Sequence, residues 1–512
     1  MSRSRSTSGV YTLPRITVEV DGNSLASAEM RALGQVRVQQ RLSQPTLCEM
    51  TFYDPPGPLD AATSLEPGTE LRITLSGHMA PLFVGQVTAV EHVYGATHEH
   101  QVHVRGYDRL HQLRKRQLLR AHVQVTPRDL AQELVADLGL SVEASESGPL
   151  WQRLIQHQQS DLELLFEVTE QCGLYFTLAD DVLHLLTLEG SGDPVPLALG
   201  DSLHEARIEA SGEPACRTVT ASGWNPLLVE TYEGQSGNAR VGRDVSTEVA
   251  PDLVGASGER SLPDETVQSV SHAEALAQAE LDRRVAREVT LWGIAEGDPR
   301  LRPGIPIEIE NVADTLSGRY VLTAVTHTID RRKGFVSELS TAPPPPRHRH
   351  RSTIAALGTV TRVDDPQGLG RVRVCLPTYG EVETEWMHVL SAGAGADKGL
   401  VILPDVDDRV LVLFSQEAPG LGVVLGGLYG MEGPRDSGVE GNAVKRYTIL
   451  TRGGHRIRLD DEEETIYLED STGSYVALSP ESVHLHAAVD LVIEAPEQAI
   501  VIRGQTIDFE RG

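Results

Sequence analysis

The sequence has few lysines and few aromatic residues, and its net charge is strongly negative. Lysine occurs at four positions, Lys115, Lys333, Lys398 and Lys445, so arginine supplies most of the positive charge and the formal net charge is −28. Nucleic-acid binding draws most of its affinity from cations that neutralise phosphates, and anionic lipids repel an acidic protein. We therefore expect no nucleic-acid partner and no resting attachment to a membrane. Aromatic residues make up 4% of the chain, so Val, Leu and Ile must supply the core, which favours β structure.

The four cysteines are isolated from one another, and long apolar runs are lacking. Cys48, Cys172, Cys216 and Cys375 form no CxxC pair, so the sequence predicts neither a zinc knuckle nor a redox disulfide, and we expect no cofactor. No stretch reaches the roughly 18 apolar residues that span a bilayer, and the N-terminus carries arginines without the apolar run of a signal peptide. These features predict a chain that is assembled in the cytoplasm.

Alternation of apolar and polar residues dominates the first two thirds of the chain. At 512 residues the chain is too long for one core, and roughly 100–200 residues per domain predicts three or four domains. Three helix signals interrupt the alternation: Thr126 before a proline, and Ser160 and Ser271, each with a glutamate three residues later. Residues 1–342 are therefore predicted to form two β-barrels or sandwiches with helical insertions. The predicted strands cover residues 16–20, 71–75, 82–93, 100–108, 305–310, 319–328 and 335–340.

A small β domain is predicted after a proline-rich linker. Residues 343–352 begin with PPPPRHRHR, which predicts a stiff spacer followed by solvated charge. Residues 353–430 contain five short strand signals and no helix signal, which favours a closed barrel such as the OB-fold. The five signals are IAALGTVTRV, GRVRVCLP, WMHVLSA, DRVLVLF and LGVVLGGLYG. Residues 431–446 are predicted to be a connector.

The first two strands of this barrel are joined by a tight turn. Asp365, Pro366, Gly368 and Gly370 carry the turn signal, because proline presets φ and glycine allows a positive φ. The glycines shape the connection and are not spaced as a phosphate-binding loop.

The C-terminal segment, residues 447–512, repeats a short alternating pattern every seven to ten residues. Each repeat supplies about two buried-type side chains and none could form a covering helix, so one copy cannot complete a core. We therefore expect three copies to intertwine as a β-helix or β-prism. The predicted core positions of this needle are Ile457, Leu459, Ile466, Leu468, Val476, Leu478, Val483, Leu485, Ile500, Ile502, Ile507 and Phe509.

Sites for chemistry are sparse. His484 and His486 share one face of a predicted strand and are weak metal candidates, but the apolar Val483 and Leu485 are expected to face inward and leave the histidines outside. The histidines of HEHQVH, residues 98–103, cannot all converge on one side of a strand. The GDSL stretch at 200–203 spells a hydrolase nucleophile block around Ser202, yet it lies between β segments and favours an ordinary turn. We expect no catalytic residue.

Several stretches in succession carry a family resemblance. In the barrel they are GTVTRVDDPQGLGRVRV, ADKGLVILPDVDDRVLVLF and GVVLGGLYG, and upstream they are VRGYDRLHQLRKR, TPRDLAQELVADLGL, IQHQQSDLELLFEVTEQCGLYF and PGIPIEIENVADTLSGRYVLTAVTHTI. Their order resembles that of the VgrG family of spike–hub proteins of contractile injection machines and of the related phage tail-spike proteins. The implied fold is mainly β with a few helices: tandem β-barrels in the hub, an OB-fold barrel and a C-terminal intertwined trimeric β-helix.

The resemblance implies a homotrimer that joins a hexameric inner tube and the baseplate to a needle. A PAAR-type tip protein would cap the needle, with Phe509, Glu510 and Arg511 as the expected contact, and the target membrane would be met only on firing. No appended enzyme is evident, so the role is expected to be mechanical. A tail-associated hydrolase acting on cell wall or esters, and a receptor-binding tail fibre, are the alternatives. A phage tail, a type VI secretion apparatus and an extracellular phage-like particle stay open, and the compact length favours the last.

Overall fold

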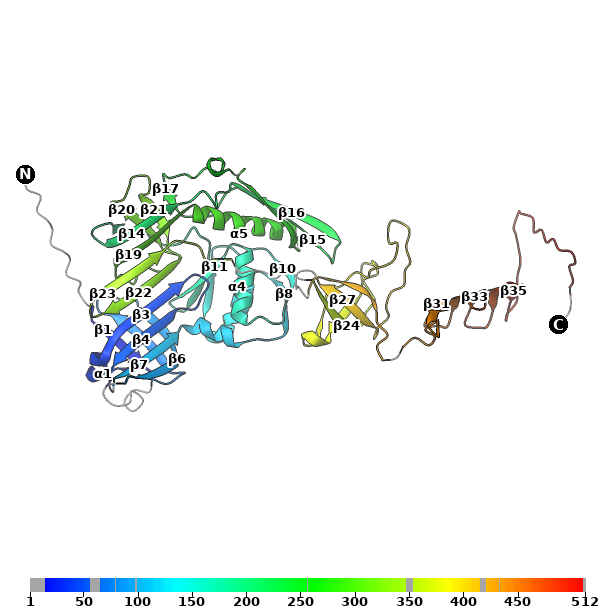
Figure 1. The fold of residues 1–512 in the computed structure, drawn as a ribbon, viewed down its shortest axis with the longest axis horizontal. Coiled ribbons are helices and arrows are strands. Elements are labelled where there is room, and N and C mark those ends of the chain that lie inside the picture. Colours follow the sequence, from blue (N-terminus) through cyan, green and yellow to red (C-terminus); the bar gives the residue numbers. More distant parts are fainter. Residues whose placement is uncertain are drawn as a thin grey trace, which may run out of the picture. The chain divides into compact units, whose positions relative to one another are not determined.

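The computed structural model describes residues 14–55, 65–78, 80–96, 99–255, 257–346, 353–414, 420–431 and 433–509. The protein divides into two compact units, Met1–Gly427 and Leu428–Gly512 (Figure 1). Residues 347–352 of the predicted linker lie outside the described residues. The described part is mainly β with a few helices, as predicted.

An 11-stranded sheet forms the framework of the first unit. Its strands are antiparallel to their neighbours, and the sheet curls around two separate cores. In spatial order they are β14 (Leu203–Ala210), β19 (Val289–Glu296), β23 (Gly334–Ser340), β22 (Ala324–Asp330), β3 (Leu33–Arg41), β4 (Leu47–Tyr53), β7 (His100–Tyr107), β6 (Phe83–Tyr94), β5 (Glu70–Leu75), β1 (Ile16–Val20) and β2 (Asn23–Ser24).

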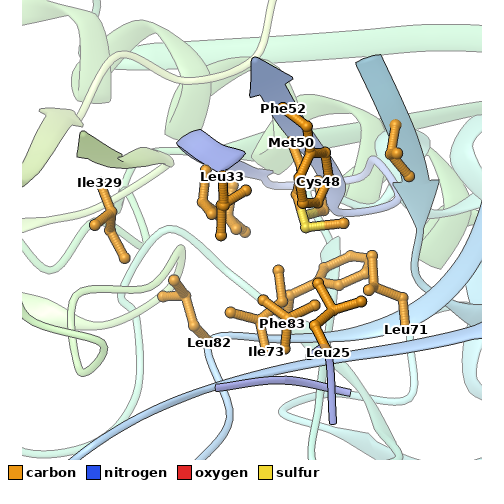
Figure 2. Close-up of a cluster of buried hydrophobic side chains, with 14 of the residues drawn as sticks. Leu25, Leu33, Cys48, Met50, Phe52, Leu71, Ile73, Leu82, Phe83 and Ile329 are labelled. Atoms are coloured by element: carbon orange, nitrogen blue, oxygen red, sulfur yellow. The ribbon is translucent and has the colours of Figure 1, made fainter. Parts of the chain in front are cut away.

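Two strands of this sheet contribute to both cores. Ile329 of β22 and Phe335 of β23 pack in the first core. Val325 and Leu339, toward the other end of the same two strands, pack in the second core. Figure 2 shows the first core, where Cys48, Met50 and Phe52 of β4 face Ile73 of β5 and Phe83 of β6. Alternate residues of each strand point inward, which is why the period-two pattern of the sequence located these strands.

Four smaller sheets complete the part of the first unit that precedes the linker. They are β8 (Arg120–Val125) with β10 (Trp151–Gln156); β9 (Ser141–Ala144), β11 (Tyr175–Ala179) and β12 (Val182–Leu186); β13 (Val195–Ala198), β17 (Asp244–Val245), β20 (Pro306–Glu310) and β21 (Gly318–Val321); and β15 (Thr218–Asn225), β16 (Glu230–Ser236) and β18 (Glu259–Thr266).

The three longest helices, α3 (Pro127–Val135), α4 (Asp161–Gln171) and α5 (Val270–Glu288), begin at side-chain caps. A shorter helix is α1 (Ser27–Ala32), and the short 3₁₀ segments are η1 (Arg109–Lys115), η2 (Ala136–Leu138), η3 (Pro251–Val254) and η4 (Pro377–Tyr379). Thr126 caps α3 and Ser160 caps α4, as predicted, and the reciprocal partner Glu163 of Ser160 was predicted too, whereas Asp129, the reciprocal partner of Thr126, was not. The prediction that α5 begins at Ser271 was wrong. The N-cap is Ser269, an extended residue whose side chain accepts from the backbone N–H of His272 at 3.2 Å, and Ser271 lies in the first turn of the helix.

Residues 353–427 form a five-stranded sheet of their own. Its order is β26 (Val382–Glu383), β25 (Arg373–Leu376), β24 (Ile354–Arg362), β27 (Arg409–Phe414) and β28 (Gly422–Gly427). The predicted strand at WMHVLSA, residues 386–392, was wrong: Met387 is fully buried, but this segment makes only isolated bridges, to Val372 and Val424. Its apolar residues fill the core without a continuous strand partner, and β26 is the fifth strand.

None of the helices in the described ranges is long and apolar enough to cross a membrane.

Candidate functional site

The second unit contains one five-stranded antiparallel meander. Its strands are β31 (Arg446–Leu450), β32 (Arg456–Asp460), β33 (Thr465–Glu469), β34 (Tyr475–Leu478) and β35 (Val483–His486), paired in chain order, after the short hairpin β29 (Val439–Glu440) and β30 (Ala443–Val444). Short polar turns join the strands: Asp460 Oδ1 accepts from the backbone N–H of Glu462 at 3.1 Å, and Asp470 Oδ1 accepts from that of Thr472 at 2.8 Å. These two aspartate turns fix the register of the β32–β33 and β33–β34 hairpins.

The register collects apolar side chains on one face of this meander. Residues that are paired across the strands point to the same side of a sheet, and two rows of pairs cross all five strands. The first row is Ile449, Ile457, Leu468, Val476 and Leu485, and the second is Tyr447, Leu459, Ile466, Leu478 and Val483. We call these ten residues the apolar face.

The apolar face is uncovered in a single chain. Ile466 is 42% exposed, Leu468 48% and Val483 71%, although in a folded monomer such side chains would be buried. Eight of the predicted needle-core residues, from Ile457 to Leu485, lie on this face.

The opposite face of the meander carries a ladder of charged and aromatic side chains. The Arg458 guanidinium lies 5.5 Å from the ring centre of Tyr467, which stacks on Tyr475 at 5.1 Å, and Tyr475 stacks on His486 at 5.0 Å. His484 and His486 thus point away from the apolar face, and His486 is engaged with an aromatic ring. No cluster of three or more potential metal ligands occurs among the residues that the structure describes.

The last repeats differ from the prediction. The segments LVIEA, AIVIR and TIDFE were predicted to be strands, but residues 487–509 contain no strand in the single chain. Ile500, Ile502, Ile507 and Phe509 are therefore not joined to the meander, and Phe509 is 90% exposed. A strand needs a neighbour to satisfy its backbone N–H and C=O groups, and one copy provides none here. Glu510 and Arg511 lie outside the described residues.

The turn between β24 and β25 is built around Asp365. Its carboxylate accepts from the backbone N–H groups of Gln367 at 3.1 Å and of Leu369 at 3.0 Å, and it forms an ion pair with Arg371. Gly368 and Gly370 have φ angles of 66° and 69°, in the left-handed region that favours glycine. The hydrogen bonds from the Arg371 guanidinium hold the pKa of Asp365 well below its usual range.

The other sequence candidates are placed as follows. Ser202 of GDSL lies in the turn between β13 and β14, where its Oγ accepts from the backbone N–H of Ala198 at 3.0 Å. His98 lies outside the described residues. His100 contacts His92 of the neighbouring strand, with 3.1 Å between ring nitrogens, whereas His103 contacts the Thr51 hydroxyl at 3.2 Å. The contact joins His92 of β6 to His100 of β7, so the spacing of the histidines within HEHQVH could not predict it.

Comparisons with known proteins agree with this architecture. The family model of the type VI secretion system/phage-baseplate injector OB domain matches residues 356–429, and the model of the Alg8 N-terminal domain matches residues 11–331, well over half of the chain. The search of curated proteins found no match.

Solved structures share the fold at low sequence identity. A chain of the Francisella PdpA-VgrG complex is 9% identical with a TM-score of 0.55, covering 93% of this chain and 80% of its own. The E. coli c3393 protein, a component of the type VI secretion system with structural similarity to the T4 bacteriophage tail proteins gp27 and gp5, is 13% identical with a TM-score of 0.53, covering 77% of this chain and 96% of its own. The 43 kDa tail protein of prophage MuSo2 from Shewanella oneidensis is 15% identical with a TM-score of 0.50, covering 64% and 98%.

The predicted resemblance to VgrG and phage tail-spike proteins is thereby confirmed, as is the presence of an OB domain. The chain belongs to the family of the Alg8 N-terminal domain, which it joins to an injector OB domain of the type VI secretion and phage-baseplate type.

Proposed function

We propose that three copies of this chain form the spike–hub of a contractile injection system. The observation that carries the proposal is the apolar face of β31–β35, two rows of side chains that cross five strands and of which all but the half-buried Val476 are exposed in one copy. Burial of such a face is the largest favourable term available to a short β segment, and the described residues of the same unit contain no helix that covers it. Three apolar faces packed around one axis would bury all of them.

The domains take separate roles in this assembly. Residues 1–342 form the hub that meets a hexameric inner tube and the baseplate, residues 353–430 form an OB collar, and residues 447–512 form the needle. Residues 487–509 become strands once neighbouring copies supply partners, and the end near Phe509 receives a PAAR-type tip protein. The role is mechanical and without catalysis, because a closed β-prism with no free edge resists bending and compression.

The solution mass tests the proposal directly. We expect a species of about 167 kDa, three times the 55.6 kDa of one chain, by light scattering. Val476→Asp places a charge on the apolar face and is expected to dissociate this species or to weaken it strongly. Ala477→Asp is the matched control, because Ala477 pairs with Tyr467 and His484 on the opposite face.

A monodisperse 55.6 kDa wild-type chain would overturn the proposal. Equal dissociation of the Val476→Asp and Ala477→Asp variants would remove the apolar face as its basis. Ester or cell-wall hydrolysis by the wild type that is lost in Ser202→Ala would favour the hydrolase alternative.

A further inference from the structure

A polar cavity of about 520 Å³ opens in the hub between the loop after β3, the end of η1 and the start of α4. Ser43 and Gln44 line it from the first side, Arg114 and Lys115 from the second, and Gln158 from the third. Its size is in the range of pockets that bind small molecules or a few side chains of a peptide.

Hydrogen bonds between the lining segments hold the cavity open. The backbone N–H of Asp161 donates to the carbonyl of Arg116 at 2.9 Å, and the Gln117 side-chain amide donates to the carbonyl of Gln158 at 2.6 Å. Ser43, with a φ of 59°, donates its backbone N–H to the carbonyl of Phe176 at 2.7 Å. The cations on the η1 side are thus followed directly by backbone that is held against the start of α4.

The charges of this segment divide into paired and unpaired cations. Three arginines between residues 109 and 120 form ion pairs: Arg109 with Asp181 at 3.2 Å, Arg116 with Asp137 at 2.8 Å and Arg120 with Asp161 at 3.0 Å. Arg114 and Lys115, the two cations that line the cavity, form no ion pair with any residue that the structure describes. Arg114 places its guanidinium 5.0 Å from the ring centre of Tyr107, and its charge also acts on the buried Asp108 carboxyl without a close ion pair.

The only carboxylate in the lining is already in use. Glu163 Oε2 accepts from the backbone N–H and from the hydroxyl of Ser160, both at 2.9 Å, in the capping box of α4. The helix terminus is therefore closed by its own residues and offers no open anion site. What the cavity offers is two exposed cations without a close ion pair among the described residues, Arg114 and Lys115, beside the uncharged side chains of Gln44 and Gln158.

We propose that this cavity binds an acidic segment of a partner protein, with Arg114 and Lys115 holding its carboxylates. A guanidinium binds a carboxylate through paired N–H donors and an ammonium through point charge, and neighbouring amides add donors. The net charge of −28 does not prevent this, because at physiological ionic strength charges act over only about 8 Å, and the cavity lining carries the two cations Arg114 and Lys115 against the one carboxylate of Glu163. A nucleic acid, by contrast, needs many phosphate contacts along an extended basic surface, which a cavity with two cations does not supply.

The proposal does not depend on the trimer, since all lining residues belong to the hub of one chain. Its consequence is a docking point on the hub that discriminates partners by charge, because local charge complementarity fixes orientation more than it adds affinity. An acidic loop of any component that meets the hub satisfies the chemistry.

The test is a titration of a fluorescein-labelled hexaglutamate peptide with the full chain, followed by fluorescence anisotropy. We expect saturable binding that weakens as salt is raised, and at least about tenfold weaker binding by Arg114→Gln/Lys115→Gln. The matched control is Arg332→Gln/Lys333→Gln, an adjacent Arg-Lys pair in the exposed turn between β22 and β23, which removes the same charge and should leave binding unchanged.

Three results would overturn the proposal. The first is the absence of saturable binding up to about 1 mM peptide, because a dissociation constant above that concentration corresponds to a binding free energy too small for a specific site. The second is an equal loss of binding in both double variants, which would show attraction to net charge alone. The third is displacement of the peptide by an equal concentration of inorganic phosphate, which would assign the cavity to a free anion. Both pairs are exposed, so unchanged thermal unfolding midpoints of the variants verify that the hub is intact.

Discussion

Arg371 and Asp365 form a two-pronged ion pair inside the first turn of the OB domain. Arg371 Nε lies 2.9 Å from Asp365 Oδ2, and Nη2 lies 2.8 Å from Oδ1. The side chains are only 6% and 2% exposed, so the pair is buried although it belongs to a surface turn. The carboxylate also accepts from three backbone N–H groups, those of Gln367, Leu369 and Arg371, so it holds the turn together through its charge.

Removal of one partner of this pair should destabilise the OB domain. For Asp365→Ala we expect a loss of about 3 kcal/mol in the free energy of unfolding, because Arg371 would stay buried without its counter-charge. This loss is measured by urea unfolding followed by the fluorescence of Trp386. Trp386 lies in the OB domain, with its ring centre 5.2 Å from the guanidinium carbon of Arg373. The control is Asp364→Ala, which removes the adjacent carboxylate, 69% exposed and paired with Arg362.

Acid should have the same effect as this substitution. The folded pKa of Asp365 lies below its usual value near 4, so its contribution is fully present above about pH 4 and is lost as the pH falls toward the folded pKa. Equal unfolding midpoints for the wild-type protein and the Asp365→Ala variant would contradict the role of the ion pair.

Close approach of a helix to a strand gives the second prediction. A Cβ atom on Gly234 of β16 would lie 2.2 Å from the backbone nitrogen of Glu274 in α5, so only glycine lets this helix lie against the strand. Gly234→Ala should cost about 1–3 kcal/mol through overpacking. Thermal unfolding of the hub checks the value.

Gly237 supplies the matched control for that experiment. It lies one residue beyond β16, and a Cβ atom there would meet only the carbonyl oxygen of Arg217 at 3.8 Å. Gly237→Ala should change stability by less than about 0.5 kcal/mol. Equal destabilisation by both substitutions would show that the cost does not arise from contact with α5, because loss of backbone freedom in the unfolded chain would stabilise both variants.

Local signals of the sequence predicted local structure well, and non-local pairing could not be predicted. The caps at Thr126 and Ser160 and the strand at 16–20 depend on neighbouring residues alone, and they were confirmed. The α5 cap was ambiguous because Ser269 and Ser271 both precede the apolar run. The pairing of β3 with β22 joins residues nearly 290 positions apart, for which no local pattern exists.

The same distinction applies to the sites. The apolar face could be predicted because a strand repeats every two residues, so Ile466 and Leu468 must share a side. The cations at Arg114 and Lys115 could not, because they differ from Arg109 and Arg116 in forming no close ion pair with a carboxylate in the part of the chain that the structure describes. Those partners, Asp181 and Asp137, come from other parts of the fold.

A buried histidine gives the last prediction. His327 of β22 is 1% exposed, its Nδ1 lies 2.8 Å from the Ser337 hydroxyl, and its Nε2 lies 3.1 Å from the carbonyl oxygen of Leu301. A carbonyl only accepts, so Nε2 carries the proton and Nδ1 accepts from the serine, which fixes the neutral ring. Burial lowers the pKa of His327 from 6.5 to about 4.

This shift makes the stability of the hub depend on pH. The folded pKa is the lower one, so stability is complete above about pH 6.5, where both states are neutral, and it falls between pH 6.5 and 4 as only the unfolded chain binds the proton. The loss at pH 4 should reach at most about 3 kcal/mol. His327→Gln keeps a donor and an acceptor but cannot titrate, so its urea midpoint should fall less between pH 7 and pH 5 than that of the wild type. His78→Gln, which alters an exposed histidine of the β5–β6 turn, should retain the wild-type dependence, and identical pH profiles for all three proteins would exclude His327 as the group responsible.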